Sequence, residues 1–196
     1  LFDSTELIYS LPEHDIEIAF LATDFTQVNF ELNQKMISLA LSLLELDKND
    51  KVIDLFCGLG NFSLPIARYA KSVVGIEGDK GLIDRAKENA QRNGVVNASF
   101  YKADLFEDIR GFEWFRGKRY NKALIDPARS GAFEFVGLMP EMGVERVVYV
   151  SCNPATLARD TVKLVELGYV LEQAGVMDMF PQTAHVESIA LFVKTN

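Results

Sequence analysis

The 196-residue sequence contains only two cysteines and two histidines. Two cysteines are too few for a disulfide framework or a four-cysteine metal site, and His14 and His185 alone cannot build a histidine-rich metal centre. Each cysteine follows a predicted strand, which fits a reducing cytoplasm better than secretion. We therefore expect a cytoplasmic protein that holds no metal in these residues.

Long apolar runs are also missing. None reaches the ~18 residues of a membrane-spanning helix, and no basic segment followed by an apolar one marks a signal peptide. Hydrophobic residues make up 48% and charged residues 24%, the proportions of a soluble globular protein, and the length suits one domain. Because the chain opens on Leu1 rather than Met, we interpret it as a fragment of a longer protein, and we expect a monomer with no membrane partner.

Positive charge is scarce, with a formal net charge of -8. This balance argues against a strongly basic nucleic-acid binder, but not against a nucleic-acid enzyme whose main binding surface lies elsewhere in the full protein. Two local basic groups stand out: Arg116, Lys118 and Arg119, and Arg129, Arg159 and Lys163. For the first group we favour a solvated surface.

From residue 51 onward, apolar strands alternate with amphipathic helices, which predicts parallel βαβ units and a doubly wound α/β fold. The last two strands have no helix between them and should pair antiparallel at an edge of a mostly parallel seven-stranded sheet. Residues 1–29 are interpreted as an extended lead-in rather than a core element, and 30–196 as the folded domain. The predicted helices are 30–46, 61–69, 80–93 and 154–167, and the predicted strands are 51–55, 72–76, 98–101, 122–125, 146–150, 169–177 and 188–194.

A glycine-rich turn, residues 54–61, follows the first strand of this series. Gly58 and Gly60 allow the backbone to approach a ligand closely, but no lysine follows as in a P-loop, and the full G-x-G-x-x-G pattern is incomplete. Glu77 ends the next strand, where a carboxylate can bind ribose hydroxyls, and Asp104 follows the third, where it can reach an adenine amino group. This order is typical of S-adenosylmethionine-dependent methyltransferases; an NAD-binding dehydrogenase is the alternative.

Cys152 lies between an apolar strand and a helix that begins at Pro154. Ligands bind at this carboxyl edge of an α/β sheet, and the start of a helix favours a lowered thiol pKa, so we expect a nucleophile. A buried structural thiol is the alternative. Cys57, inside the glycine-rich turn, is interpreted as a small apolar filler.

A thiol nucleophile suits methylation of a uracil ring at carbon 5. Carbon 5 becomes reactive when a thiolate adds to carbon 6, and a base must then remove the carbon 5 proton. The fourth strand ends in Asp126-Pro127-Ala128-Arg129, which lacks the aromatic residue typical of methylation at exocyclic amines. Spacing alone leaves Glu187 and His185 both open as the base.

These segments resemble the RNA uracil-5-methyltransferases, most closely the branch that acts on 23S ribosomal RNA. The matching pieces run in order through residues 24–29, 33–36, 54–62, 126–129, 151–160 and 178–181, followed by His185 and Glu187. The resemblance implies a Rossmann-like class I methyltransferase that uses S-adenosylmethionine to methylate carbon 5 of a uridine in 23S ribosomal RNA, at the 1939-type site. A transfer RNA substrate, or a binding module that does no chemistry by itself, are the alternatives.

The resemblance also implies residue roles. Cys152 matches the nucleophile and Glu187 the base. Asp126 matches a position between cofactor and target uracil, with Arg129 on the substrate side. The positions that match cofactor contacts are Gln27, Phe56, Asn61, Glu77, Asp104 and Asp126. Relatives carry an N-terminal OB-type RNA-binding domain and often an iron–sulfur cluster, and neither is present in these residues.

Overall fold

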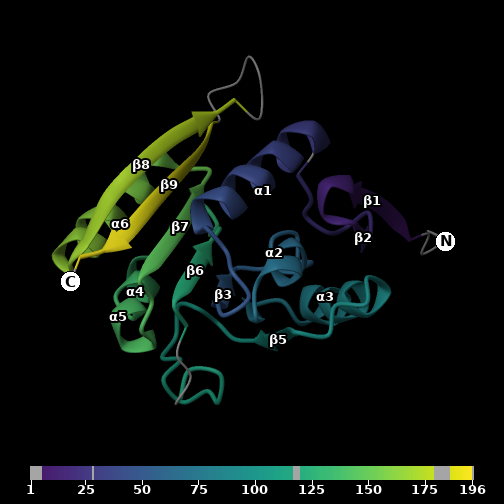
Figure 1. The fold of residues 1–196 in the computed structure, drawn as a ribbon, viewed down its shortest axis with the longest axis horizontal. Helices are drawn as coiled ribbons and strands as arrows, with labels where there is room; N and C mark the ends of the chain where they lie inside the picture. Colours follow the sequence, from purple (N-terminus) through teal and green to yellow (C-terminus); the bar gives the residue numbers. More distant parts are fainter. Residues whose placement is uncertain (1–5, 28, 117–119, 179–185, 196) are drawn as a thin grey trace.

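Seven strands form one twisted sheet in the order β5-β4-β3-β6-β7-β9-β8 (Figure 1). The computed structural model describes residues 6–27, 29–116, 120–178 and 186–195. Strands β3 to β7 are parallel, whereas β9 pairs antiparallel with both β7 and the edge strand β8. The bounds are β3 (Lys51–Leu55), β4 (Ser72–Glu77), β5 (Ala98–Lys102), β6 (Lys122–Ile125), β7 (Arg146–Ser151), β8 (Tyr169–Met177) and β9 (Glu187–Lys194). The predicted mostly parallel α/β sheet with an antiparallel edge is confirmed.

Helices cover both faces of the sheet. Apolar side chains of α1, α2 and α3 join one buried cluster, and those of α4, α5 and α6 join a second cluster on the other face. Figure 1 shows α1 crossing the sheet on one side and α6 lying behind β8 and β9. The bounds are α1 (Phe30–Leu44), α2 (Ser63–Tyr69), α3 (Lys80–Arg92), α4 (Phe133–Val136), α5 (Met139–Met142) and α6 (Pro154–Glu166). The sequence did not predict α4 and α5, because four residues are too few to display a helical period.

The central strands are buried on both faces, which explains their continuous apolar sequences. Val52, Ile53 and Leu55 of β3 are inaccessible to solvent, as are Val147 to Val150 of β7. Parallel strands covered by helices on both sides need such runs rather than strict alternation. The one acidic exception in β3 is Asp54, which is also fully buried.

An antiparallel hairpin precedes the main sheet. It consists of β1 (Leu7–Leu11), the 3₁₀ turn η1 (Pro12–His14) and β2 (Ile16–Phe20). Leu11, Ile16 and Ile18 are buried in the same cluster as α1, α2 and α3. The interpretation of this segment as lying outside the core is therefore wrong: every second residue of β2 packs inward, and the strand was too short for this pattern to be decisive.

Candidate active site

The predicted site residues gather at the carboxyl edge of the parallel strands. Leu55, the last residue of β3, pairs with Ile76 of β4 and Ile125 of β6, and Ile125 pairs with Tyr149 of β7. The residues at the ends of these strands, or just after them, must therefore lie along one edge of the sheet. They are Phe56, Glu77, Asp126 and Cys152.

The antiparallel strand β9 brings Glu187 to the same edge. Val150 pairs with Ile189, and Ser151 pairs with Ser188, so the next position in this register places Cys152 opposite Glu187. Glu187 is 5% exposed, whereas Cys152 keeps part of its surface open. A thiol and a buried carboxylate from neighbouring strands thus form the centre of the candidate site.

Negative charge dominates the electrostatics of this centre. Burial raises the pKa of Cys152, and the carboxylates of Glu187 and Asp126 raise it further, against a smaller lowering by Arg129. Burial also raises the pKa of Glu187, and burial together with Glu187 raises the pKa of Asp126 to about 7. The net shift of the thiol pKa is therefore upward, because desolvation and two carboxylates outweigh the groups that lower it.

The glycine-rich turn after β3 adopts backbone conformations that suit its composition. Gly58 and Gly60 have φ values of 52° and 91°, and Phe56 has a φ of 64°. A side chain added at Gly58 would meet no atom within 4 Å, so the turn presents bare backbone on that side. Cys57 is buried, and burial raises its pKa well above the usual range, which confirms its interpretation as a filler.

Glu77 fixes this turn to the end of β4. Its Oε2 accepts a hydrogen bond from Gly58 N at 3.2 Å, and its Oε1 accepts from Gly78 N at 2.7 Å and Asp79 N at 3.0 Å. A carboxylate offers about four lone-pair directions, so Glu77 retains capacity for a further donor. Glu77, the residue predicted to bind the ribose, therefore also holds the turn in place.

Asp104 lies beside an aromatic pair. Its side chain is exposed and accepts a hydrogen bond from Phe106 N at 2.9 Å, while the rings of Phe56 and Phe106 lie 6.2 Å apart. Phe106 is 52% exposed, so the pair offers an accessible aromatic surface next to a carboxylate. Sequence reasoning missed Phe106, although an aromatic residue two positions after Asp104 was a usable signal.

The remaining predicted residues occupy different surroundings. Asn61 bonds with Asn33 of α1 and Tyr9 of β1. Gln27 is half-buried in the connection between β2 and α1, and in the described part of the chain no hydrogen bond joins it to the turn. His185, the competing base, lies outside the described residues, as do Lys118 and Arg119.

Helix α6 clamps the loop that carries Arg129. Asn153 Nδ2 donates to Arg129 O at 3.0 Å, Arg159 donates to Ser130 O at 2.9 Å, and Asp160 Oδ2 accepts from Ala132 N at 2.7 Å. Asn153 also caps α6, directly after Cys152. The loop after β6 and the turn carrying the thiol are therefore held to one helix.

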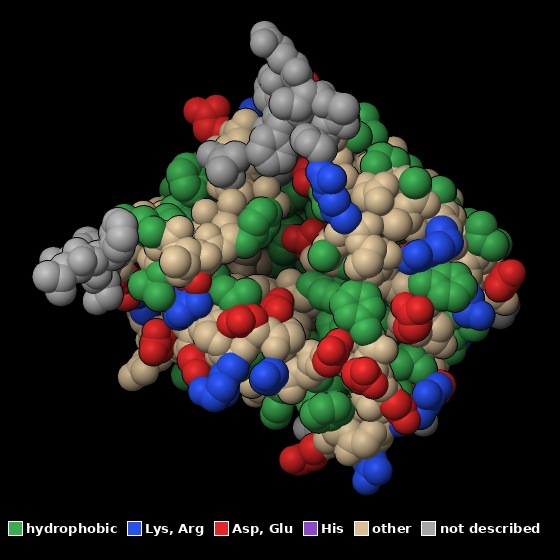
Figure 2. Space-filling view, turned by 180° about the vertical axis from the view of Figure 1, so that it is seen from behind, with side chains coloured by type: hydrophobic (Ala, Val, Ile, Leu, Met, Phe, Trp, Pro, Cys, Tyr) green, Lys and Arg blue, Asp and Glu red, His purple; other side chains and the backbone are tan. Residues whose placement is uncertain are grey.

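The surface in Figure 2 mixes both signs of charge. Lys and Arg side chains alternate there with Asp and Glu side chains, and the described residues on that face form no broad basic field. The described residues contain no group of three or more His, Cys, Asp or Glu side chains placed to hold a metal ion. No helix within the described ranges is long and apolar enough to cross a membrane.

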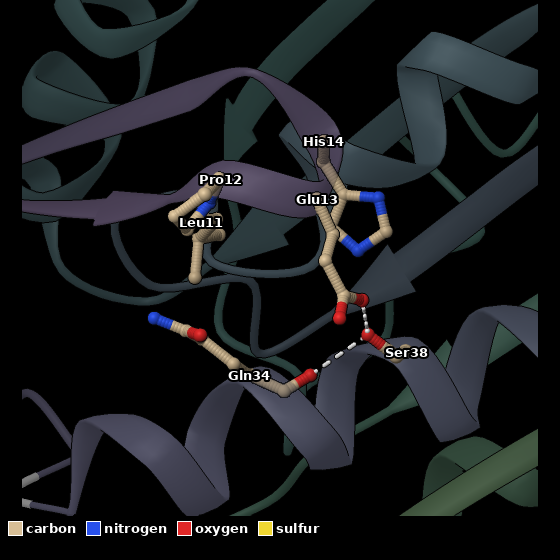
Figure 3. A pocket seen from close by; sticks show the side chains of 6 residues that line it. All are labelled: Leu11, Pro12, Glu13, His14, Gln34 and Ser38. Atoms are coloured by element: carbon tan, nitrogen blue, oxygen red, sulfur yellow. Dashed lines mark hydrogen bonds between the residues drawn. The ribbon is translucent and has the colours of Figure 1, made fainter.

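A hollow between η1 and α1 lies apart from this site (Figure 3). Ser38 Oγ donates to Glu13 Oε2 at 2.5 Å and is also bonded to Gln34 O at 3.0 Å. Its lining contains no residue from the carboxyl ends of the parallel strands, and the polar side chains there bond mainly to neighbouring hairpin and helix residues: Gln34 Nε2 donates to Ser10 O, and His14 Nδ1 lies 3.1 Å from the Tyr69 hydroxyl. The hollow is therefore a packing feature between hairpin and helix.

Two aspartates, the buried Asp54 and the partly buried Asp126, should make the protein less stable as the pH rises. The folded-state pKa of Asp54 and that of Asp126 are each raised to about 7, so the folded chain holds these protons more tightly than the unfolded chain. The resulting stabilisation is complete below about pH 4 and is lost as the pH rises through about 7. Thermal unfolding between about pH 5 and pH 8 should show a falling Tm, and Asp54→Asn should flatten the slope. A Tm that rises over this window would contradict the assignment.

The fold and the edge site define a methyltransferase-type α/β domain with a thiol–carboxylate pair. Residues 5–195 match the model of the tRNA (uracil-5-)-methyltransferase family, and the chain belongs to this family. The resemblance inferred from the motifs is confirmed.

Similar proteins extend this placement. The chain is 68% identical over 194 residues to a protein of Vesicomyosocius okutanii named 23S rRNA (uracil(1939)-C(5))-methyltransferase RlmD, covering 99% of this chain and 44% of that protein. A protein of the same name from Xanthomonas axonopodis is 58% identical, with 95% and 42% covered. The chain thus spans less than half the length of these curated relatives.

Solved structures agree on the fold. The tRNA (uracil-54, C5)-methyltransferase of Pyrococcus abyssi, in complex with S-adenosyl-L-homocysteine, superposes with a TM-score of 0.79 at 28% identity, covering 96% of this chain and 44% of that one. TYW2 of M. jannaschii, in complex with AdoMet, gives a TM-score of 0.69 at 20% identity, covering 100% of this chain and 89% of that one, and supports the fold alone.

Proposed function

We propose that this chain is the catalytic part of an enzyme that methylates carbon 5 of a uridine in 23S ribosomal RNA, at the 1939-type position. The donor is S-adenosylmethionine, and the reaction passes through a covalent adduct of Cys152 with carbon 6. We propose further that the chain acts as a monomer in the cytoplasm. The observation that carries the proposal is the pairing of β7 with β9, which sets Cys152 opposite Glu187 beside a glycine-rich turn.

The residues at the edge fit the proposed cofactor. Gly58 presents open backbone, and the aromatic surface of Phe56 and Phe106 lies next to Asp104, where a purine ring and its amino group can be bound. The pKa values of Asp54 and Asp126 are raised first by burial and further by neighbouring carboxylates. Such a centre attracts a cation, and a cation bound there lowers the pKa of the neighbouring groups. S-adenosylmethionine carries a positive sulfonium and supplies an electrophilic methyl group.

The chain's own residues then perform the carbon chemistry. The Cys152 thiolate forms a bond from Sγ to carbon 6 of the uracil, and the electron pair of the ring double bond moves onto carbon 5 and the adjacent carbonyl. Carbon 5 would then take the methyl group from the donor, whose bond from methyl carbon to sulfur would break and release S-adenosylhomocysteine. Arg129 lies on the loop beside this centre and lowers the pKa of Cys152, so it favours the thiolate.

Glu187 completes the cycle as the base. Its carboxylate takes the proton from carbon 5, the electrons of that bond restore the double bond between carbons 5 and 6, and the bond to Sγ breaks to release the thiolate. The raised pKa of Glu187 makes it a stronger proton acceptor than an exposed glutamate. Its burial shields the adduct from bulk water.

A transfer RNA substrate is the second candidate. The observation in its favour is the superposition on the Pyrococcus abyssi enzyme, whose name specifies a tRNA uracil. The higher identity to proteins named for 23S ribosomal RNA favours the first. Methyl transfer to a 23S fragment and to unmodified tRNA, measured side by side, distinguishes them.

The test of the reaction class uses a 23S ribosomal RNA fragment containing 5-fluorouridine. Fluorine at carbon 5 cannot leave as a proton, so the enzyme should remain covalently attached to the RNA after methyl transfer. Denaturing electrophoresis should show a protein–RNA adduct that requires S-adenosylmethionine and is absent from Cys152→Ala.

The control is the full-length Vesicomyosocius-type relative, because the chain spans 44% of it. An adduct with the relative but not with this chain assigns RNA capture to residues outside the chain. Failure of both proteins to form one refutes the uracil mechanism.

A further inference from the structure

The hairpin that precedes the main sheet reaches the glycine-rich turn through Tyr9. The Tyr9 hydroxyl donates a hydrogen bond to Asn61 Oδ1 at 2.8 Å. The Tyr9 ring is held between Phe20 and Phe30, with centroid distances of 5.8 and 5.5 Å. Burial raises the pKa of Tyr9 well above its usual range, so the hydroxyl stays protonated. Tyr9 is thus a fixed donor aimed at the end of the turn.

Asn33 of α1 completes the fixation of the Asn61 amide. Asn33 Nδ2 donates to Asn61 Oδ1 at 3.1 Å, and Asn61 Nδ2 donates to Asn33 Oδ1 at 3.0 Å. With Tyr9, both lone pairs of Asn61 Oδ1 are occupied. One N–H of Asn61 has no acceptor among the described residues, and Asn61 is only partly buried. Toward a ligand, Asn61 can therefore act only as a donor.

A second polar bridge joins the hairpin to the same turn. Asn89 of α3 is fully buried, and its Oδ1 accepts from Ala19 N at 2.8 Å. Its Nδ2 donates to Ala19 O at 3.1 Å and to Leu59 O at 3.2 Å. Strand β1 thus contacts Asn61, and strand β2 is linked to Leu59. The hairpin is thus tied to the turn at two positions, Asn61 and Leu59, in addition to its apolar packing.

We propose that the β1–β2 hairpin belongs to the cofactor site, with Tyr9 as a positioning residue. Tyr9 and Asn33 hold the Asn61 amide in one orientation, so that its free N–H faces an acceptor atom of the bound cofactor. The inference rests on the proposed S-adenosylmethionine site and adds to it a specific role for a segment that contains no cofactor-contacting residue of its own.

The test is calorimetric titration of S-adenosylhomocysteine into the wild type and Tyr9→Phe. The substitution keeps the ring and removes only the hydroxyl. Loss of one orienting hydrogen bond should weaken binding about threefold to tenfold. The matched control is Tyr69→Phe, because the Tyr69 hydroxyl lies 3.1 Å from His14 Nδ1 and so also ties the hairpin to a helix, without contacting the turn. Its Kd should equal that of the wild type.

Thermal unfolding of each variant without ligand separates positioning from general loosening of the hairpin. Tyr9→Phe should lose affinity at a temperature where it is fully folded, and Asn33→Ala, which removes the other partner of Asn61, should shift the Kd in the same direction. Equal Kd values for the wild type, Tyr9→Phe and Tyr69→Phe overturn the inference and leave the proposed function intact. No binding by the wild type refutes the proposed cofactor itself.

Discussion

Replacing Glu187 with Gln is expected to stop the enzyme after one methyl transfer. Glutamine has the same shape but cannot take the carbon 5 proton, so the bond from Cys152 to carbon 6 cannot break. With an ordinary 23S fragment and S-adenosylmethionine, the variant should accumulate a methylated protein–RNA adduct. Turnover should fall about 10²- to 10⁴-fold, the usual contribution of a general base. Denaturing electrophoresis and single-turnover methyl incorporation measure both effects.

Two further variants make this result specific. Cys152→Ala should give neither adduct nor methylation, because the first bond cannot form. Glu172→Gln changes an exposed glutamate on β8 and should leave turnover unchanged. Normal turnover by Glu187→Gln would show that another group is the base, and His185 would be the first to test. An inactive variant without adduct would instead place Glu187 in binding the uridine.

Replacing Asp160 with Asn is expected to cause the largest loss of stability. Asp160 is fully buried and accepts hydrogen bonds from Ala132 N, the Tyr149 hydroxyl at 2.6 Å and the Arg159 guanidinium at 2.7 and 2.8 Å. An amide cannot accept all of these and would set its own N–H groups against one of the donors. Because the Arg159 side chain is 46% exposed, the loss comes mainly from the buried donors of Ala132 and Tyr149, and leaving a buried donor unpaired costs about 1–3 kcal/mol.

The measurement is the free energy of unfolding from urea titrations. Asp84→Asn is the matched control, since the Asp84–Lys80 pair lies at the solvent-exposed surface of α3 and should contribute little to stability. Because Asp160 holds the loop that carries Arg129, the variant should also lose methyl transfer at temperatures where it is folded. Equally small losses of unfolding free energy in Asp160→Asn and Asp84→Asn would show that the hydrogen bonds of Asp160 contribute little to stability.

Much of the fold was predictable because it depends on local patterns. The helices near 30–46, 80–93 and 154–167 follow from their apolar spacing, and their observed ends differ by one or two residues. The positions of Glu77, Asp104 and Asp126 follow because each ends or follows a parallel strand. Such strands finish at one edge, so the sequence alone places these carboxylates together.

The parts that escaped prediction depend on contacts between distant segments. The resemblance placed Glu187 beside Cys152, but the strand order that brings them together, with β9 between β7 and β8, is specified by no local pattern. The direction of the Cys152 pKa shift depends on its burial and on the carboxylates around it, and sequence spacing does not show which carboxylates lie close in the fold. The role of Asp160 was hidden because its partners, Ala132 and Tyr149, lie on other elements.

The place of β9 also affects how the protein is made on the ribosome. Synthesis delivers β7 and β8 first, and each then has an edge that only β9 can pair, while Cys152 is already present without Glu187 opposite it. A nascent chain that has not yet released β9 therefore has neither a closed sheet nor a complete pair of proposed catalytic residues, and its open strand edges favour association with other chains. Pairing of β9 therefore closes the sheet and places Glu187 opposite Cys152 in the same step.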